Sequence, residues 1–110
     1  MKVRLIKKRS IEEFVLQNAG SKIAFGTWLT LLKMADWNIP GDIQSLFATS
    51  DLLGNGSNRV VFDIAGNQYR IICKYQFIES KVILYIKWIG SHAEYSKLCK
   101  EQKQFTINKY

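Results

Sequence analysis

The chain has 110 residues, 47% of them apolar, and carries 16 lysine and arginine residues against nine aspartate and glutamate residues. This length predicts a single domain over residues 1–110, and the apolar content excludes a disordered chain. A net charge of +7 on so small a protein favours a polyanionic partner, namely nucleic acid, a membrane surface or an acidic protein, although basic charge can also serve solubility alone.

Cys73 and Cys99 are the only cysteines, and they lack the spacing of a zinc site or a disulfide framework. They predict two reduced thiols in a cytoplasmic protein. No apolar run is long enough to span a membrane, and the basic start at 1–9 is not followed by the apolar stretch of a secretory signal. Because no such segment is present, we expect no membrane contact. The acidic residues show no metal-ligand spacing, so we expect no metal or other cofactor.

The first third of the chain predicts a strand followed by helices. Residues 2–6 have the pattern of a short strand. Ser10 and Glu13 have the spacing of a capping box, which predicts a helix start there. Apolar residues continue at helical spacing through 11–35 with a break at Gly20, which predicts a helical hairpin.

The middle of the chain predicts a break, a short helix and a loop. Pro40, the only proline, interrupts the helical pattern, and Asp42 is the predicted N-cap of a short helix. Residues 51–58 are rich in Gly, Asn and Ser, which predicts a surface loop.

The second half changes to strand-like patterning. Residues 59–65, 68–77 and 82–89 are rich in Val, Ile, Tyr and Phe. Gly66 and Asn67 predict a tight hairpin between the first two segments, and a second short turn precedes the third, so an antiparallel meander is expected.

The C-terminal part predicts a short helix over 93–100, whereas the tail at 101–110 is polar, basic and weakly patterned. Helices followed by an antiparallel sheet predict an α+β architecture, with the N-terminal helices packed on one face of the sheet. The opposite face is then free for a ligand.

Strand alternation divides the meander into two faces. An apolar set on the third strand is expected to face the core: Val82, Leu84, Ile86 and Trp88. The open face is expected to collect basic and aromatic side chains: Arg70, Lys74, Tyr85 and Lys87. Such a face suits single-stranded RNA, which is bound through charge and base stacking.

RNA cleavage without a metal needs a base for the ribose 2′-OH, cations for the phosphorane and an acid for the leaving 5′-oxygen. His92 is the only histidine, the residue type that most readily exchanges protons near neutral pH. Arg70 and Lys87 could supply the cations. Tyr95, one helical turn beyond His92, could transfer a proton or stack on a base. The alternatives are a surface or capping role for the histidine and a packing role for the tyrosine.

Three ordered blocks of the sequence resemble the HigB toxin family. Residues 37–43, 58–70 and 85–95 follow the patterns W-x-x-P-x-D-I, N-R-V-V-F-x-I-x-G-N-x-Y-R and Y-I-x-x-I-G-[ST]-H-x-E-Y. The resemblance implies a RelE-like fold and a ribosome-dependent endoribonuclease that cuts messenger RNA in the A site. It also implies a HigA-type antitoxin, a helix-turn-helix protein that blocks the toxin and represses the shared operon.

The resemblance assigns functional roles to four residues: Arg70, His92, Tyr95 and, more weakly, Lys87. RNA contacts are expected from Arg59, Lys74, Tyr85 and Lys97, with a structural role for Arg59 as the alternative. Ser96 stands where members often have an aspartate. The tail is expected either to touch ribosomal RNA or the antitoxin, or to be flexible.

Two further functions stay open at this point. A non-catalytic RNA- or ribosome-binding module would block translation by occupancy. A protein-binding partner of a helix-turn-helix repressor would have no effect on RNA. A His92→Ala variant separates the endoribonuclease from the non-catalytic module, because only a nuclease would lose cleavage while still binding.

Overall fold

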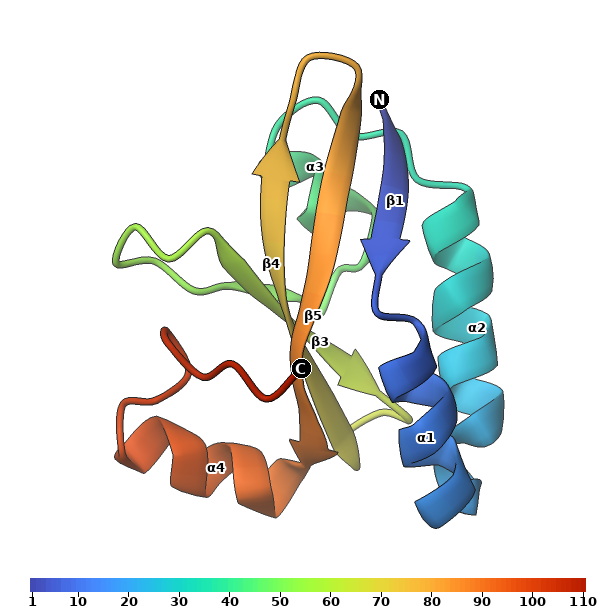
Figure 1. Ribbon diagram of the computed structural model, residues 1–110, viewed down its shortest axis with the longest axis vertical. Coiled ribbons are helices and arrows are strands. Elements are labelled where there is room, and N and C mark those ends of the chain that lie inside the picture. The colour runs from blue at the N-terminus through green and yellow to red at the C-terminus, as the bar shows by residue number, and fades with distance from the viewer.

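A five-stranded mixed sheet carries helices on both of its faces in the computed structural model, which describes residues 1–110 (Figure 1). In chain order the elements are β1 (Lys2–Ile6), α1 (Arg9–Gln17), the 3-10 turn η1 (Ala19–Ser21), α2 (Lys22–Lys33), α3 (Gly41–Leu46), β2 (Asp51–Leu52), β3 (Arg59–Ile64), β4 (Tyr69–Phe77), β5 (Lys81–Ser91) and α4 (His92–Lys100). The predicted α+β class and its RelE-like arrangement are confirmed. No helix combines the length and the apolar character needed to cross a membrane.

The strand order is β1-β5-β4-β3-β2, and the predicted antiparallel meander of β3, β4 and β5 is confirmed. The N-terminal strand β1 adds to the edge of β5 in parallel. The hairpin loop is longer than predicted, because Ile64 pairs with Tyr69 and leaves four residues between them. Ala65 and Gly66 turn the chain there with φ of 55° and 63°, values that glycine adopts far more readily than alanine.

A β-bulge at Lys87 overturns part of the predicted face assignment. Ile72 pairs with Trp88 and Cys73 with Ile86, so Lys87 is the extra residue between them. An extra residue reverses the alternation of side chains beyond it. Trp88 therefore faces away from Val82, Leu84 and Ile86, and the prediction that it shares their face was wrong.

Two apolar clusters lie on the two faces of the sheet. The main core lies under α1, α2 and α3, where the rings of Trp28 and Phe62 meet with centroids 5.2 Å apart. The smaller cluster lies under α4 and is formed by Leu53, Val61, Ile72, Trp88 and Leu98. Figure 1 shows α1 and α2 alongside β1 on one flank and α4 on the other. The open face is therefore partly covered at the α4 end.

Two predicted helix caps differ in the structure. α1 begins at Arg9, so Ser10 lies buried inside its first turn and makes no capping bond, while Glu13 pairs with Arg9 at 3.2 Å. α3 begins at Gly41, and Asp42 lies within its first turn. The Asp42 carboxylate instead accepts hydrogen bonds from the main-chain N–H groups of residues 38 and 39. Neither carboxylate therefore caps its helix as the spacing predicted.

The tail after α4 turns back across the open face. Phe105 and Ile107 pack against the smaller cluster, and Tyr110 packs against the edge of the main core. The main-chain N–H of Lys109 donates to the carbonyl of Lys87 at 2.9 Å. The tail therefore pairs with β5 just beyond the point where β1 ends.

Candidate functional site

Two groups of the predicted site residues lie on the open face of the sheet. The first group lies where β4 begins, β5 ends and α4 begins, and consists of Arg70, His92 and Tyr95. The second group lies farther along β4, around the bulge, and consists of Arg59, Lys74, Tyr85 and Lys87. Lys74 follows Arg70 by four residues on the same strand, which corresponds to about 13 Å.

A capping box fixes the position of His92. The Ser91 hydroxyl accepts from the Glu94 N–H at 3.1 Å, and the Glu94 carboxylate accepts from the Ser91 N–H at 2.8 Å. The hydrogen bond from the Ser91 N–H lowers the pKa of Glu94. The His92 N–H in turn donates to the carbonyl of Gln68 in the hairpin loop at 2.9 Å. The imidazole is exposed and makes no hydrogen bond or ion pair with the chain.

Three hydrogen bonds hold the Arg70 side chain in place at this end of the sheet. Its Nε donates to Asp63 Oδ1 at 3.0 Å, its Nη1 to the Tyr69 carbonyl at 3.0 Å, and its Nη2 to Asn67 Oδ1. The side chain is 9% exposed. A guanidinium has five N–H donors, so two of them stay free for another partner.

The Tyr95 ring packs against the Trp88 ring, with centroids 6.1 Å apart. Burial raises the pKa of Tyr95 well above its usual range, Cys99 and Asp51 raise it further, and the charge of Arg70 lowers it. The phenol therefore stays protonated over a wider pH range than a free tyrosine, which makes it a weaker acid.

The second group forms one row across three strands, since Arg59 pairs with Lys74 and Lys74 with Tyr85. Lys87 Nζ lies 5.5 Å from the centre of the Tyr85 ring and donates to Asn108 Oδ1 at 3.2 Å. Burial lowers the pKa of Lys87, and the charges of Arg59, Lys7 and Lys74 lower it further. None of these cations pairs with a carboxylate.

Arg59 and Lys97 differ from the other predicted site residues. Arg59 is buried under the tail, where its Nη1 donates to the carbonyls of Ile107 at 2.7 Å and Gln104 at 3.3 Å, and burial lowers its pKa. Lys97 lies exposed on α4, within reach of Glu101, whose pKa it helps to lower. The structure therefore brings Arg59 to the tail, and leaves Lys97 on the outer side of α4 as a free cation.

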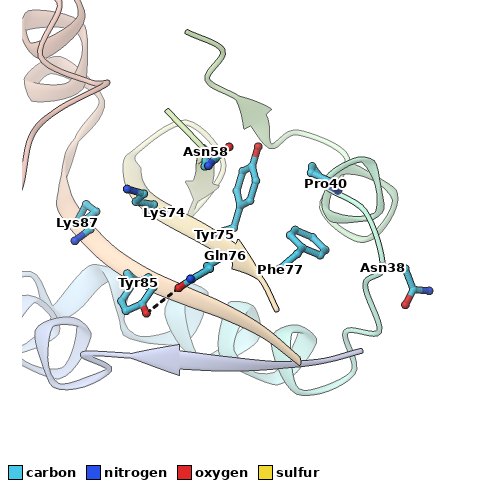
Figure 2. Close-up of a pocket in the computed structure, with 9 residues that line it drawn as sticks. All are labelled: Asn38, Pro40, Asn58, Lys74, Tyr75, Gln76, Phe77, Tyr85 and Lys87. Carbon is cyan, nitrogen blue, oxygen red and sulfur yellow. Dashed lines mark hydrogen bonds between the residues drawn. The ribbon is translucent and has the colours of Figure 1, made fainter. Parts of the chain in front are cut away.

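A pocket of about 710 Å³ adjoins the second group, and Figure 2 shows the side chains that line it. Lys74, Tyr85 and Lys87 belong to its wall, as expected for ligand contacts on the open face. Tyr75 and Phe77 also line it, but from the other face of β4, where both pack against the main core. No sequence pattern pointed to these two rings, since they alternate with polar residues as any half-buried strand does.

No group of three or more His, Cys, Asp and Glu side chains lies close enough together to hold a metal ion. The chemistry available at the first group is therefore that of an imidazole, a phenol and a guanidinium. At the second group it is that of ammonium ions beside aromatic rings.

Comparison with known proteins gives two matches. The model of the family described as HigB_toxin, RelE-like toxic component of a toxin-antitoxin system, matches residues 21–98. A curated protein of Escherichia coli O6:H1 (strain CFT073), named mRNA interferase HigB, is 24% identical over 102 residues, which cover 93% of this chain and 97% of the relative. The family match includes both groups of site residues.

Proposed function

The chain belongs to the HigB toxin family, the RelE-like toxic component of a toxin–antitoxin system, and we propose that it is an endoribonuclease that cuts translated messenger RNA on the ribosome. The family membership and a relative named mRNA interferase support the reaction class. The observation that carries the proposal is that Arg70, at the start of β4, and His92 and Tyr95, in the first turn of α4, lie at the same end of the sheet, with the imidazole exposed and the guanidinium anchored by Asp63.

We assign the base to His92 and the acid to Tyr95. The imidazole is exposed and free of protein partners, so it can accept the proton of a ribose 2′-OH. Attack of that oxygen on the adjacent phosphorus forms a cyclic phosphate and expels the 5′-oxygen. Tyr95 carries its proton at neutral pH, as an ordinary phenol does, and can give that proton to the leaving oxygen, although the burial that raises its pKa makes it a weaker acid. The balanced step needs no metal ion.

The phosphorane charge is assigned to two cations. Arg70 has two free N–H groups and is held in place by Asp63, so it can bind a phosphate oxygen without first reorganising. Lys87 lies at the bulge and assists from the second group. Lys74, Tyr85 and Lys97 are proposed to hold the flanking RNA, and Arg59, which is buried against the tail, is proposed to have the structural role that was its alternative. Placement of the message by the ribosome supplies the remaining orientation.

The partner that controls this activity is proposed to be a HigA-type helix-turn-helix antitoxin. Membership in a toxin–antitoxin family supports the existence of an antitoxin. The basic open face suits an acidic or amphipathic segment of such a protein, which would exclude RNA by covering it.

Primer extension on a message with and without its start codon tests the proposal. Wild-type chain should produce in-frame cuts only in the translated message, and His92→Ala should lose them. Lys22→Ala, which changes an exposed lysine of α2 on the opposite face, should cut as wild type does. Equal cutting of the untranslated message would overturn ribosome dependence. Arrest of translation with intact messages would favour inhibition by occupancy.

A further inference from the structure

The outer side of β1 is an open edge of the sheet, away from the residues assigned to cleavage. β1 pairs with β5 on one side and has no partner strand on the other (Figure 1). Beyond its pairing with β5, no main-chain group of residues 2–6 makes a hydrogen bond with the chain. The Trp37 N–H donates to the carbonyl of Met1, just before the strand begins. Such a row of unpaired N–H and C=O groups is a template on which another strand can add.

An apolar notch opens beside this edge, between β1 and α2. Its volume is about 160 Å³, which suits one apolar side chain, since an apolar cavity of about 150 Å³ can hold benzene. Four apolar residues line it: Val3, Leu5, Leu29 and Leu32. All four belong to the main core or pack against it, and Val3 pairs with the core residue Val82, so the whole lining comes from the core side of the sheet. Three of the four stay partly exposed, so the core is incompletely covered at this edge.

Exposed cations surround the edge and the notch. Lys8 and Lys33 lie at the rim of the notch. Lys2 and Arg4 alternate with the two apolar residues of β1, so their side chains point to the other face of the sheet. None of the four forms an ion pair, because the ion pairs of the chain involve other cations. Lys2 helps to lower the pKa of Asp36, but that carboxylate pairs with the N-terminal amino group instead. The edge is therefore ready for a partner with negative charge.

These features together favour an acidic polypeptide over other occupants of the edge. A second copy of this chain is disfavoured, because two β1 strands side by side would place Lys2 and Arg4 of both copies against one another. Basic residues on edge strands commonly prevent such self-pairing. An RNA strand would neutralise the cations, but it has no main chain to pair with the edge and no aliphatic side chain for the notch. An extended acidic segment supplies all three.

We propose that the β1 edge binds an extended, acidic segment of the antitoxin, which adds to the five-stranded sheet as a further strand. Alternate side chains of the segment are acidic, toward Lys2 and Arg4, and apolar, toward the core side, where one of them fills the notch. The inference rests on the proposed function in that the partner is the antitoxin, which membership in a toxin–antitoxin family supports. It gives the antitoxin a place of attachment at the margin of the sheet, outside the residues assigned to RNA.

Hydrogen–deuterium exchange tests the location. The chain is compared alone and in complex with the full-length antitoxin encoded in its operon. Strand addition forms new main-chain hydrogen bonds at the edge, so amides of residues 2–6 should exchange more slowly in the complex. Protection confined to β4, β5 and α4 would overturn the proposal, because the antitoxin would then bind the open face alone. Protection of residues 2–6 in the isolated chain as its concentration rises would also overturn it, because the edge would then pair with a second copy.

Charge reversal tests the complementarity. Arg4→Glu and Lys33→Glu should each weaken binding of the purified antitoxin about tenfold, because each sets a like charge against the acidic segment. Lys22→Glu makes the same change in net charge at the opposite end of α2 and should stay within about threefold of wild type. All three residues are exposed, so the substitutions change binding and leave the core intact.

Equal affinities of Arg4→Glu, Lys33→Glu and Lys22→Glu would overturn the proposal. These outcomes are independent of the cleavage test, because they measure binding of the antitoxin alone. The antitoxin could add a strand to β1 whether or not the chain cuts RNA, and the chain could cut messages even if the antitoxin binds elsewhere.

Discussion

The Nε of Arg70 lies 3.0 Å from Oδ1 of Asp63, directly across the β3–β4 pair. The hairpin loop between these strands supplies a further oxygen from Asn67, so the guanidinium is fixed from two sides. A cation that is already aimed needs little reorganisation when negative charge develops near it. The pair therefore links the stability of the hairpin to the site that we assign to cleavage.

Asp63→Asn should loosen this pair while keeping the size of the side chain. We expect the free energy of unfolding to fall by about 2 kcal/mol, because a part-buried, charge-assisted hydrogen bond is weakened. Cleavage should also fall, since Arg70 is no longer aimed. Urea denaturation and primer extension measure the two effects. Glu13→Gln, which weakens the exposed pair with Arg9, is the matched control and should cost less than about 0.5 kcal/mol. Equal losses in both variants would contradict a structural role for the Arg70 pair.

Tyr95 should give the stability of the protein a dependence on alkaline pH. Burial raises the pKa of Tyr95 above the ordinary value of about 10. In that pH range the folded chain keeps a proton that the unfolded chain releases, so this stabilisation is complete below about pH 10 and is lost as the pH rises further. Unfolding measured from pH 8 to 11 should therefore show a steeper alkaline loss in wild type than in Tyr95→Phe. Parallel curves would contradict the burial of this phenol.

Tyr95→Phe should also remove the proposed acid while keeping the ring against Trp88. We expect cleavage on the ribosome to fall by about 10²- to 10⁴-fold, the usual contribution of general acid–base catalysis. Binding of a single-stranded RNA hexamer should stay within about threefold of wild type, because no cation and no ring is lost. Cleavage at the wild-type rate would assign Tyr95 a packing role only.

Gly90→Ala should displace Trp88, because a Cβ at this position would penetrate the indole ring. Overpacking of this kind costs about 1–3 kcal/mol, and it should move Tyr95 together with the indole. Thermal unfolding and tryptophan fluorescence measure the change. Gly26→Ala, in α2 with open space around it, should instead stabilise the protein by about 0.5–1 kcal/mol. A neutral Gly90→Ala variant would show that the indole can move aside freely.

The sequence predicted those features of the fold that depend on neighbours along the chain. The strand at 2–6, the helical hairpin and the meander follow from local apolar periods, and all are present. The parallel addition of β1 to β5 depends on residues at distant positions in the chain, which no local period encodes. The face of Trp88 was wrong for a related reason, since the bulge at Lys87 is set by the register against β4.

The candidate site shows the same limit. Family resemblance singled out Arg70, His92 and Tyr95, and the structure places them at one end of the sheet. Strand alternation grouped Arg70 with Lys74 on one face, but the distance along β4 divides them between two groups. The pocket rings could not be foreseen, because the segment around Pro40 that faces them is brought there only by the folded chain.

Arg59 tests whether the tail is an integral part of this face. Its guanidinium bridges the carbonyls of Gln104 and Ile107, and no carboxylate shares its burial. Arg59→Lys keeps the charge but not the planar fork, so one ammonium cannot replace both bonds. We expect the substitution to reduce the free energy that holds the tail against the sheet by about 1.4 kcal/mol, which makes the open form of the tail about tenfold more populated. Trypsin should then cleave after Lys103 correspondingly faster. Lys22→Arg is the control and should leave that rate unchanged. Unchanged cleavage together with weaker RNA binding would instead make Arg59 an RNA contact.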